Sequence, residues 1–116
     1  MEIVGGLVRF AGAIDRAQLE RLLLDLVRGH GVVRLKGRVW LAGKTLPLQI
    51  QMVGPRLNSW FEAAPATAWH PPQSVGLDLV VLSFEETAAA AIQTALQSVV
   101  TATPARASTA ASIPSG

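Results

Sequence analysis

Residues 32–41 constrain the fold of this chain more than any other stretch. Their sequence, Val-Val-Arg-Leu-Lys-Gly-Arg-Val-Trp-Leu, alternates apolar and polar side chains, which is the pattern of a β-strand with one buried face. The polar positions Arg34, Lys36 and Arg38 carry the same charge, and Trp40 continues their row. The stretch therefore predicts a sheet that buries one face and presents on the other a basic row ending in a tryptophan.

The composition indicates a single folded domain with a short tail. Of the 116 residues, 50% are hydrophobic and 16% are charged, which excludes a disordered chain over most of the length. The apolar run at residues 79–82 is far shorter than the roughly 20 residues that cross a bilayer, and the first residues lack the pattern of a signal peptide. We therefore expect a cytoplasmic protein, with a domain at residues 1–102 and a disordered Ala/Ser/Thr/Pro tail at 103–116.

Hydrophobic periodicity predicts an α+β domain with the order β-α-β-β-β-α, in which the third strand is interrupted and resumes near residue 57. Asp15 with Gln18, and Ser83 with Glu86, form capping-box patterns ahead of the two helices. The hairpins imply a mainly antiparallel sheet with both helices packed on one face. The strands are expected at residues 3–11, 32–41, 45–53 and 76–83, and the helices at 15–28 and 85–100. The predicted core consists of Leu19, Leu22, Leu23, Leu26, Leu35, Ile50, Val80, Leu82, Ile92 and Leu96.

Basic residues gather in one part of the chain. Six of them, and no acidic residue, lie between Asp25 and Glu62. Such a block fits phosphates or an acidic protein surface, and its other interpretation is the solvated face of a sheet. A β-bulge at Gly37 would divide the block, because it would turn Arg38 to the face opposite Arg34.

The sequence predicts no catalytic, cofactor-binding or metal-binding residue in this chain. A phosphate-binding P-loop is missing, so we expect no binding or hydrolysis of GTP here. The chain has no cysteine, and His30 and His70 lack the spacing of a metal site, His30 being interpreted as a helix cap. Asp78 is expected to face solvent or to pair with an arginine such as Arg34, and Ser83 does not belong to a nucleophile motif.

The segment Arg-Leu-Lys-Gly-Arg-Val-Trp-Leu at residues 34–41 resembles the Arg-x-Lys-Gly-x-x-Trp-Leu strand of the C-terminal domain of CobW-type proteins. These are GTPases linked to metal handling and cobalamin synthesis. The similarity extends over residues 7–100, through the helix start at Ile14 and Asp15, the loop that contains Trp69 and the Glu85-Glu86 helix. The chain departs from the family pattern in lacking a proline near Ala13 and a histidine-rich loop.

The resemblance implies a non-catalytic regulatory and docking domain of a GTP-dependent metallochaperone. The family's P-loop GTPase domain and its Cys-x-Cys-Cys motif are missing from this chain, so GTP, Mg²⁺ and a transition metal, cobalt or zinc, are implied for the full-length protein only. The chain is then an excised domain, which the tail favours, or a stand-alone copy. The implied partners are the GTPase domain of the same protein and a metal-requiring client, with no membrane partner and with homo-oligomerisation left open. The docking contacts are expected at Arg34, Lys36, Arg38 and Trp40.

The alternative is a stand-alone basic β-sheet module that binds nucleic acid or another anionic partner. A basic strand that carries a tryptophan is typical of sheets on which bases stack. The chain has no tyrosine, and its phenylalanines lie away from that strand, so we do not expect a nucleic-acid partner. A steep loss of binding with salt would distinguish this alternative from protein docking.

Overall fold

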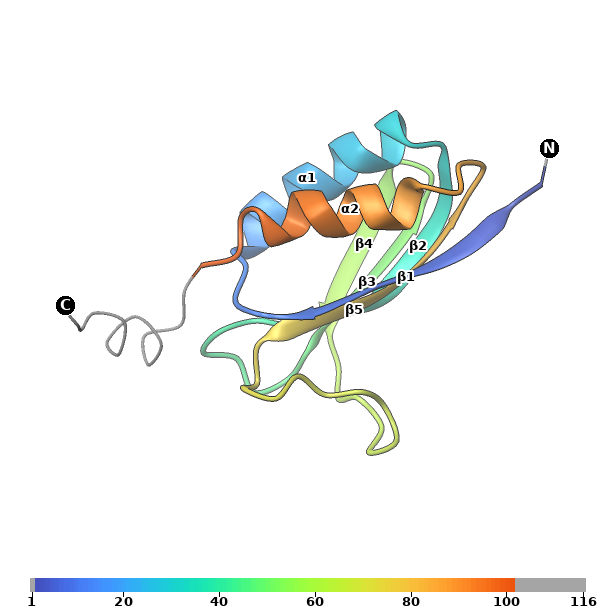
Figure 1. The fold of residues 1–116 in the computed structure, drawn as a ribbon. Helices are drawn as coiled ribbons and strands as arrows, with labels where there is room; N and C mark the ends of the chain where they lie inside the picture. Colours follow the sequence, from blue (N-terminus) through green and yellow to red (C-terminus); the bar gives the residue numbers. More distant parts are fainter. Residues whose placement is uncertain (1, 102–116) are drawn as a thin grey trace, which may run out of the picture.

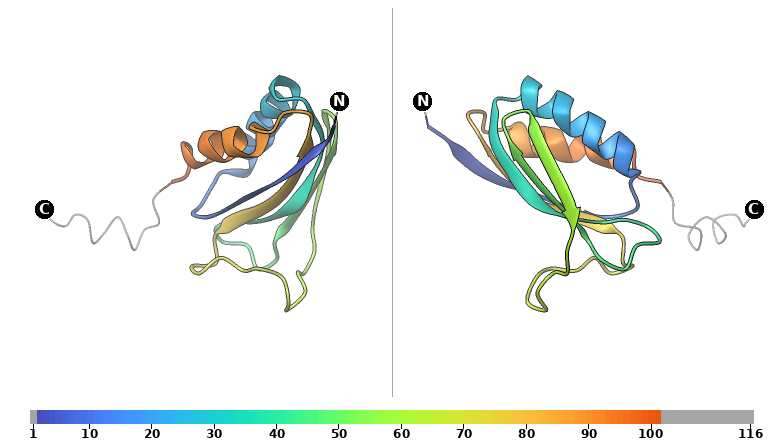
Figure 2. Two further views of the ribbon diagram at one scale, coloured as in Figure 1. Left: turned by 45° about the vertical axis from the view of Figure 1, so that its right-hand side comes forward. Right: turned by 180° about the vertical axis from the view of Figure 1, so that it is seen from behind.

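A computed structural model describes residues 2–101, which form a five-stranded antiparallel sheet with two helices on one of its faces (Figures 1 and 2). The strands lie in the order β1-β5-β2-β3-β4. The elements along the chain are β1 (Val4–Ala11), α1 (Arg16–Gly29), β2 (Val32–Trp40), β3 (Leu48–Val53), β4 (Arg56–Phe61), β5 (Gly76–Ser83) and α2 (Ala88–Gln97). The predicted α+β class is confirmed, and the interruption of the third predicted strand is real, since it separates β3 from β4. The predicted tail lies outside the described residues.

Helix α1 begins and ends where its sequence signals lie. Asp15 is the N-cap, and its carboxylate accepts a hydrogen bond of 3.0 Å from the backbone N–H of Gln18. At the other end the N–H of His30 donates to the carbonyl of Leu26, and Gly31 follows with φ +61°, the left-handed conformation that commonly ends a helix. The interpretation of His30 as a helix cap is confirmed.

Helix α2 begins later than predicted, at Ala88, and the capping box assigned to Ser83 is wrong. Ser83 is the last residue of β5, and its hydroxyl donates to the carbonyl of Glu85 at 2.6 Å. The actual N-cap, Thr87, makes no side-chain cap hydrogen bond. Packing positions α2 instead, because a Cβ added at Gly6 of β1 would lie only 2.5 Å from the Cβ of Ala89. That glycine lets the helix approach the sheet closely.

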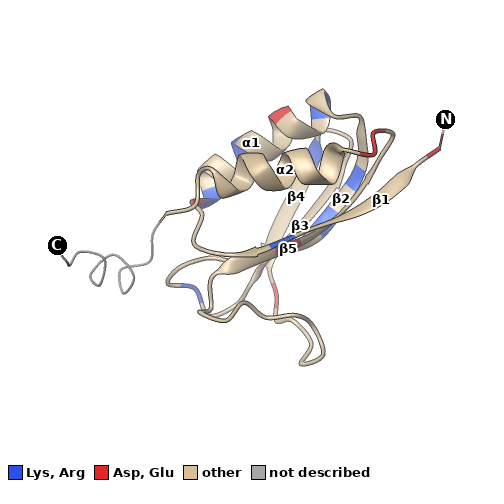
Figure 3. Ribbon diagram, in the orientation of Figure 1, with Lys and Arg blue, Asp and Glu red and all other residues tan. Residues whose placement is uncertain are grey.

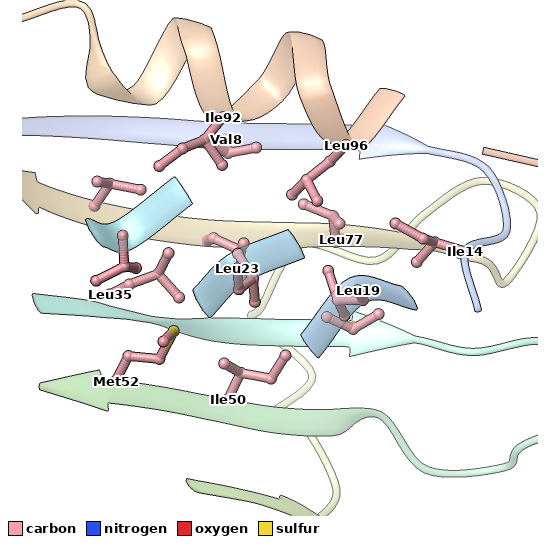
Figure 4. Packing of buried hydrophobic residues seen from close by; sticks show 14 of the residues in the cluster. Val8, Ile14, Leu19, Leu23, Leu35, Ile50, Met52, Leu77, Ile92 and Leu96 are labelled. Carbon is pink, nitrogen blue, oxygen red and sulfur yellow. The ribbon is translucent and has the colours of Figure 1, made fainter. Parts of the chain in front are cut away.

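The core lies between the helices and the sheet, as Figure 4 shows. Six of the ten predicted core residues are buried there, and Leu22 and Leu26 pack against them half-buried. Two core assignments are wrong, because Val80 and Leu82 point to the other face of the sheet. Strand β5 is apolar on both of its sides, so hydrophobicity alone does not show which of its alternate residues face the helices. The side chains that β5 buries under the helices are Leu77, Leu79 and Val81.

Strand β2 keeps its alternation, because its irregularity lies between Val32 and Arg34 and not at Gly37. Gly37 pairs in register with Ile50 on one side and Leu79 on the other. A Cβ at Gly37 would collide with the backbone of Asp78 on β5, so the glycine is required by a close approach of two strands. The alternative of a bulge at Gly37 is therefore wrong. Within residues 2–101, no helix has the length and apolarity to span a membrane.

Candidate functional site

The face of the sheet that carries no helix presents rows of side chains that cross all five strands. We call this surface the open face. Its central row lies on residues that are cross-strand partners, from β1 to β4: Arg9, Asp78, Arg38, Gln49 and Trp60. The rows on either side hold Leu7, Val80, Lys36, Gln51 and Asn58, and Ala11, Gly76 and Trp40. Strand β2 thus brings Arg34, Lys36, Arg38 and Trp40 to one face, and Figure 3 shows its basic positions in blue.

Most cations of the open face take part in no ion pair with another residue of the described range 2–101. The ion pairs of the described chain are Arg9 with Asp78 at 3.0 Å, Arg16 with Glu20 at 3.2 Å, and a contact of 3.5 Å between His30 and Glu85 that is ionic when the imidazole is protonated. The expected pairing of Asp78 with an arginine is confirmed, although Arg9 is the partner. The cations that take part in no ion pair within residues 2–101 include Arg34, Lys36, Arg38 and Arg56.

A shallow hollow of about 280 Å³ lies at the middle of the open face. Lys36 and Arg38 line it from β2, Gln49 and Gln51 from β3, and Trp60 from β4. Asp78 and Val80 of β5 also line it. The Nε atom of Arg38 is buried and finds no hydrogen-bond acceptor in the described part of the chain. The hollow therefore combines positive charge with a donor, the Nε–H of Arg38, that no acceptor within residues 2–101 satisfies.

Trp40 shares the face of the basic residues but lies under a loop. The loop, residues 62–75, extends from the end of the sheet opposite the α1–β2 connection (Figure 1). The Trp40 and Trp69 rings meet edge to face with centroids 5.8 Å apart, and the His70 ring lies 5.6 Å from Trp40. The guanidinium of Arg9 lies 5.1 Å from the Trp69 ring centroid. Trp40 is consequently only 9% exposed, and its ring holds the loop against the sheet.

Trp60 is an exposed aromatic residue that the sequence analysis missed. It is 42% exposed, and its indole N–H donates to Glu62 at 2.7 Å. Its orientation follows from its neighbour Ser59, which faces α1, where its hydroxyl lies 3.1 Å from both Arg16 and Glu20. Since side chains alternate along a strand, Trp60 points to the open face. The alternation of side chains along β4 indicates this orientation. Because the expected third strand was interrupted, the sequence analysis did not assign the faces of its second part.

The two histidines lie at opposite ends of the fold. His30 caps α1 beside Glu85, whereas His70 lies in the loop 62–75 against Trp40. Among residues 2–101, no three His, Cys, Asp or Glu side chains are grouped so that they could hold a metal ion. The described residues therefore do not fit a resident metal site.

Comparison with known proteins places the chain in a defined context. The family model of the cobalamin synthesis protein CobW C-terminal domain matches residues 3–100. A zinc chaperone CobW from Sinorhizobium is 31% identical over 97 residues, which cover 84% of this chain and 25% of the relative. The zinc-bound YjiA GTPase from E. coli, at 16% identity, has a similar fold with a TM-score of 0.65 over 85% of this chain and 30% of that one. A zinc-bound triple mutant of YjiA GTPase gives a TM-score of 0.66 at 17% identity over the same shares. The chain thus spans about a quarter of the length of its curated relative.

Proposed function

This chain belongs to the family of CobW C-terminal domains, and from that premise we propose that it is a non-catalytic docking and regulatory domain of a GTP-dependent metallochaperone. Its curated relative is named a zinc chaperone, so zinc is the metal that we propose for the whole protein. GTP hydrolysis and metal transfer are assigned to a GTPase domain outside this chain. This domain contacts that GTPase domain or the client that receives the metal.

The open face is the surface that we propose for docking. The observation that carries the proposal is the group of cations on a helix-free sheet, Arg34, Lys36 and Arg38, with no ion-pair partner in the described chain. Exposed apolar side chains lie beside them, with Val80 at 46% and Leu7 at 50% exposure. Arginine and tryptophan are the side chains that most often dominate the energy of a protein interface. On the open face the half-buried Arg38 and the exposed Trp60 line one hollow, and the exposed Arg34 lies on the same strand as Arg38.

The proposed role of Trp40 in docking is indirect. Its ring supports the loop 62–75 through Trp69 and His70, and Arg9 connects that loop to the central row, since it pairs with Asp78 and lies over Trp69. A partner seated on the open face would therefore meet a fixed loop at one end of the surface. Pre-organisation of this kind lowers the entropy cost of binding.

Calorimetric titration of the 116-residue chain with the proposed GTPase domain of the whole protein tests this proposal. We expect the triple replacement Arg34→Gln, Lys36→Gln and Arg38→Gln to weaken the affinity by about tenfold or more, because it removes charge-assisted contacts. Trp60→Ala should weaken it to a similar degree. Arg21→Gln and Arg28→Gln, exposed on α1, are the matched controls and should leave the affinity unchanged. Binding that survives every open-face replacement would contradict the assignment of this surface.

A further inference from the structure

The charges of the open face indicate which partner chemistry it takes. We infer that the hollow binds the carboxylate of an acidic protein segment, with Arg38 and Lys36 as its cations and with Val80 and Leu7 in contact with an apolar side chain of the same segment. This inference rests on the proposed docking role and specifies its partner. It concerns the residues of the hollow and the row beside it.

The balance of charge on the open face favours an anion. Asp78, the acidic residue of the central row, is bound to Arg9 at 3.0 Å and its side chain is only 16% exposed. That carboxylate forms its ion pair with Arg9 and none with Arg38, although Asp78 and Arg38 are cross-strand partners. Lys36 lies two residues along the same strand and has no ion-pair partner within residues 2–101. Two unpaired cations beside one hollow attract a carboxylate both at long range and in contact.

The donors of the hollow suit a carboxylate in particular. A guanidinium can form two parallel hydrogen bonds with the two oxygens of one carboxylate. The amide of Gln49 already donates to the carbonyl of Glu62 at 3.0 Å, which fixes its orientation, whereas Gln51 is exposed and no hydrogen bond of its side chain occurs within the described chain. Arg38, Lys36 and the Gln51 amide thus provide the donors that remain free for a ligand in this hollow.

The apolar part of the inference comes from the neighbouring row. Val80 of β5 is the cross-strand partner of both Lys36 and Leu7. Adjacent strands lie about 5 Å apart, so this apolar pair is one strand away from the cation. Every second residue of an extended segment shares a face, about 7 Å from the next, so an acidic and an apolar side chain of one segment reach Lys36 and the neighbouring apolar pair together. The combination favours a protein over a small anion.

Features of the same surface disfavour a nucleic acid. The carboxylate of Glu62 accepts a hydrogen bond from the Trp60 indole, so a phosphate chain stacked on Trp60 would meet a negative charge there. Trp40 and Trp69 are packed against each other, so Trp60 is the tryptophan of this face whose ring is free for base stacking. Stacking platforms use successive aromatic side chains.

Nuclear magnetic resonance titration of the ¹⁵N-labelled 116-residue chain tests the inference directly. The probe is the blocked peptide Ac-Glu-Ala-Leu-Ala-Glu-NH₂, with Ac-Gln-Ala-Leu-Ala-Gln-NH₂ as its uncharged counterpart and a short thymidine oligonucleotide as the phosphate probe. We expect the glutamate peptide to cause saturable shifts at the amides of Lys36, Arg38, Gln51 and Val80, and the glutamine peptide to cause none. Arg38→Gln should weaken the affinity about tenfold or more, and Arg21→Gln should not.

Two kinds of result would overturn the inference. Equal binding of the two peptides, or shifts confined to other elements, would show that no carboxylate is recognised in the hollow. Binding of the oligonucleotide alone at the same amides would assign the hollow to phosphates. If Arg38→Gln does not fold, as its own spectrum would reveal, Lys36→Gln at an exposed position replaces it as the decisive variant.

The peptide experiment and the titration with the GTPase domain can fail separately. If the triple variant loses GTPase-domain binding but the chain does not bind the peptide, the docking role is supported and carboxylate recognition is contradicted. Peptide binding without GTPase-domain binding keeps the carboxylate site and removes that partner.

Discussion

The two faces of the sheet are made by the same five strands, yet they carry opposite chemistry. The helix-covered face is aliphatic, and Leu35, Val39 and Leu79 on it are fully buried. The open face carries Arg38 and Lys36 between those positions, with apolar residues such as Val80 left exposed. Because strand side chains alternate, one row of a strand can be committed to stability while the next row stays available for binding. Replacements on the two faces should therefore separate the free energy of unfolding from affinity.

The largest expected effect is on the helix-covered face. Leu23→Ala and Leu96→Ala remove side chains that are fully buried between the layers, and each should lower the free energy of unfolding by about 2–5 kcal/mol because it leaves a cavity. Val80→Ala on the open face is the matched control and should cost less than about 0.5 kcal/mol if its exposure is as observed. Urea denaturation followed by circular dichroism measures all three. Equal losses at Val80 and Leu23 would contradict the assignment of the faces.

Much of this contrast could be predicted from sequence, because it rests on local alternation. The strand expected at residues 76–83 has those bounds, and the basic row of β2 lies on one face as its pattern indicates. The prediction of which β5 residues face the core failed because both sides of that strand are apolar. The predicted start of α2 was wrong because the Ser83 pattern suggested a cap, whereas packing against Gly6 positions that helix.

The candidate site was less predictable, because its geometry depends on contacts between distant residues. Trp40 is buried by Trp69 and His70, about thirty residues away in the chain. No local sequence pattern predicts that contact. The pairing of Asp78 with Arg9 depends equally on β1 and β5 being neighbours. The strand order of a sheet is not encoded in the period of any one strand.

A smaller effect on stability is expected at Gly37, where β2 and β5 approach each other closely. Gly37→Ala should destabilise the domain by about 1–3 kcal/mol, since its Cβ would collide with the Asp78 backbone and force β2 and β5 apart. Thermal denaturation monitored by circular dichroism would show the lower midpoint. Gly43→Ala, which meets no atom within 4 Å but has φ +78°, is the control for backbone strain alone. A midpoint for Gly37→Ala no lower than that of the control would contradict the close approach.

The loop 62–75 should respond more weakly than either layer. Trp69→Ala removes an edge-to-face contact with Trp40 and the stacking of Arg9, and such an aromatic pair is worth about 0.5–1.5 kcal/mol. We expect a loss of that size and a rise in Trp40 exposure, measured as a red shift of tryptophan fluorescence. Because Trp60 is already exposed, Trp60→Phe in the same background keeps its emission from masking the change. An unchanged spectrum would mean that the loop is held without this contact.

The smallest effect is expected for the charges of the open face themselves. Arg34, Lys36 and Arg38 alternate along β2, so their like charges lie close together, and none takes part in an ion pair within the described chain. Their replacement by glutamine removes repulsion rather than attraction, and the free energy of unfolding should change by less than about 0.5 kcal/mol, with any change toward greater stability at low salt. Arg9→Gln is the contrasting variant, because it breaks the pair with Asp78 and should destabilise the domain slightly more. Urea denaturation at low and high salt would show the difference. Marked destabilisation by the triple replacement would mean that these cations stabilise the fold. It would then contradict the proposal that the open face is a surface available to a partner.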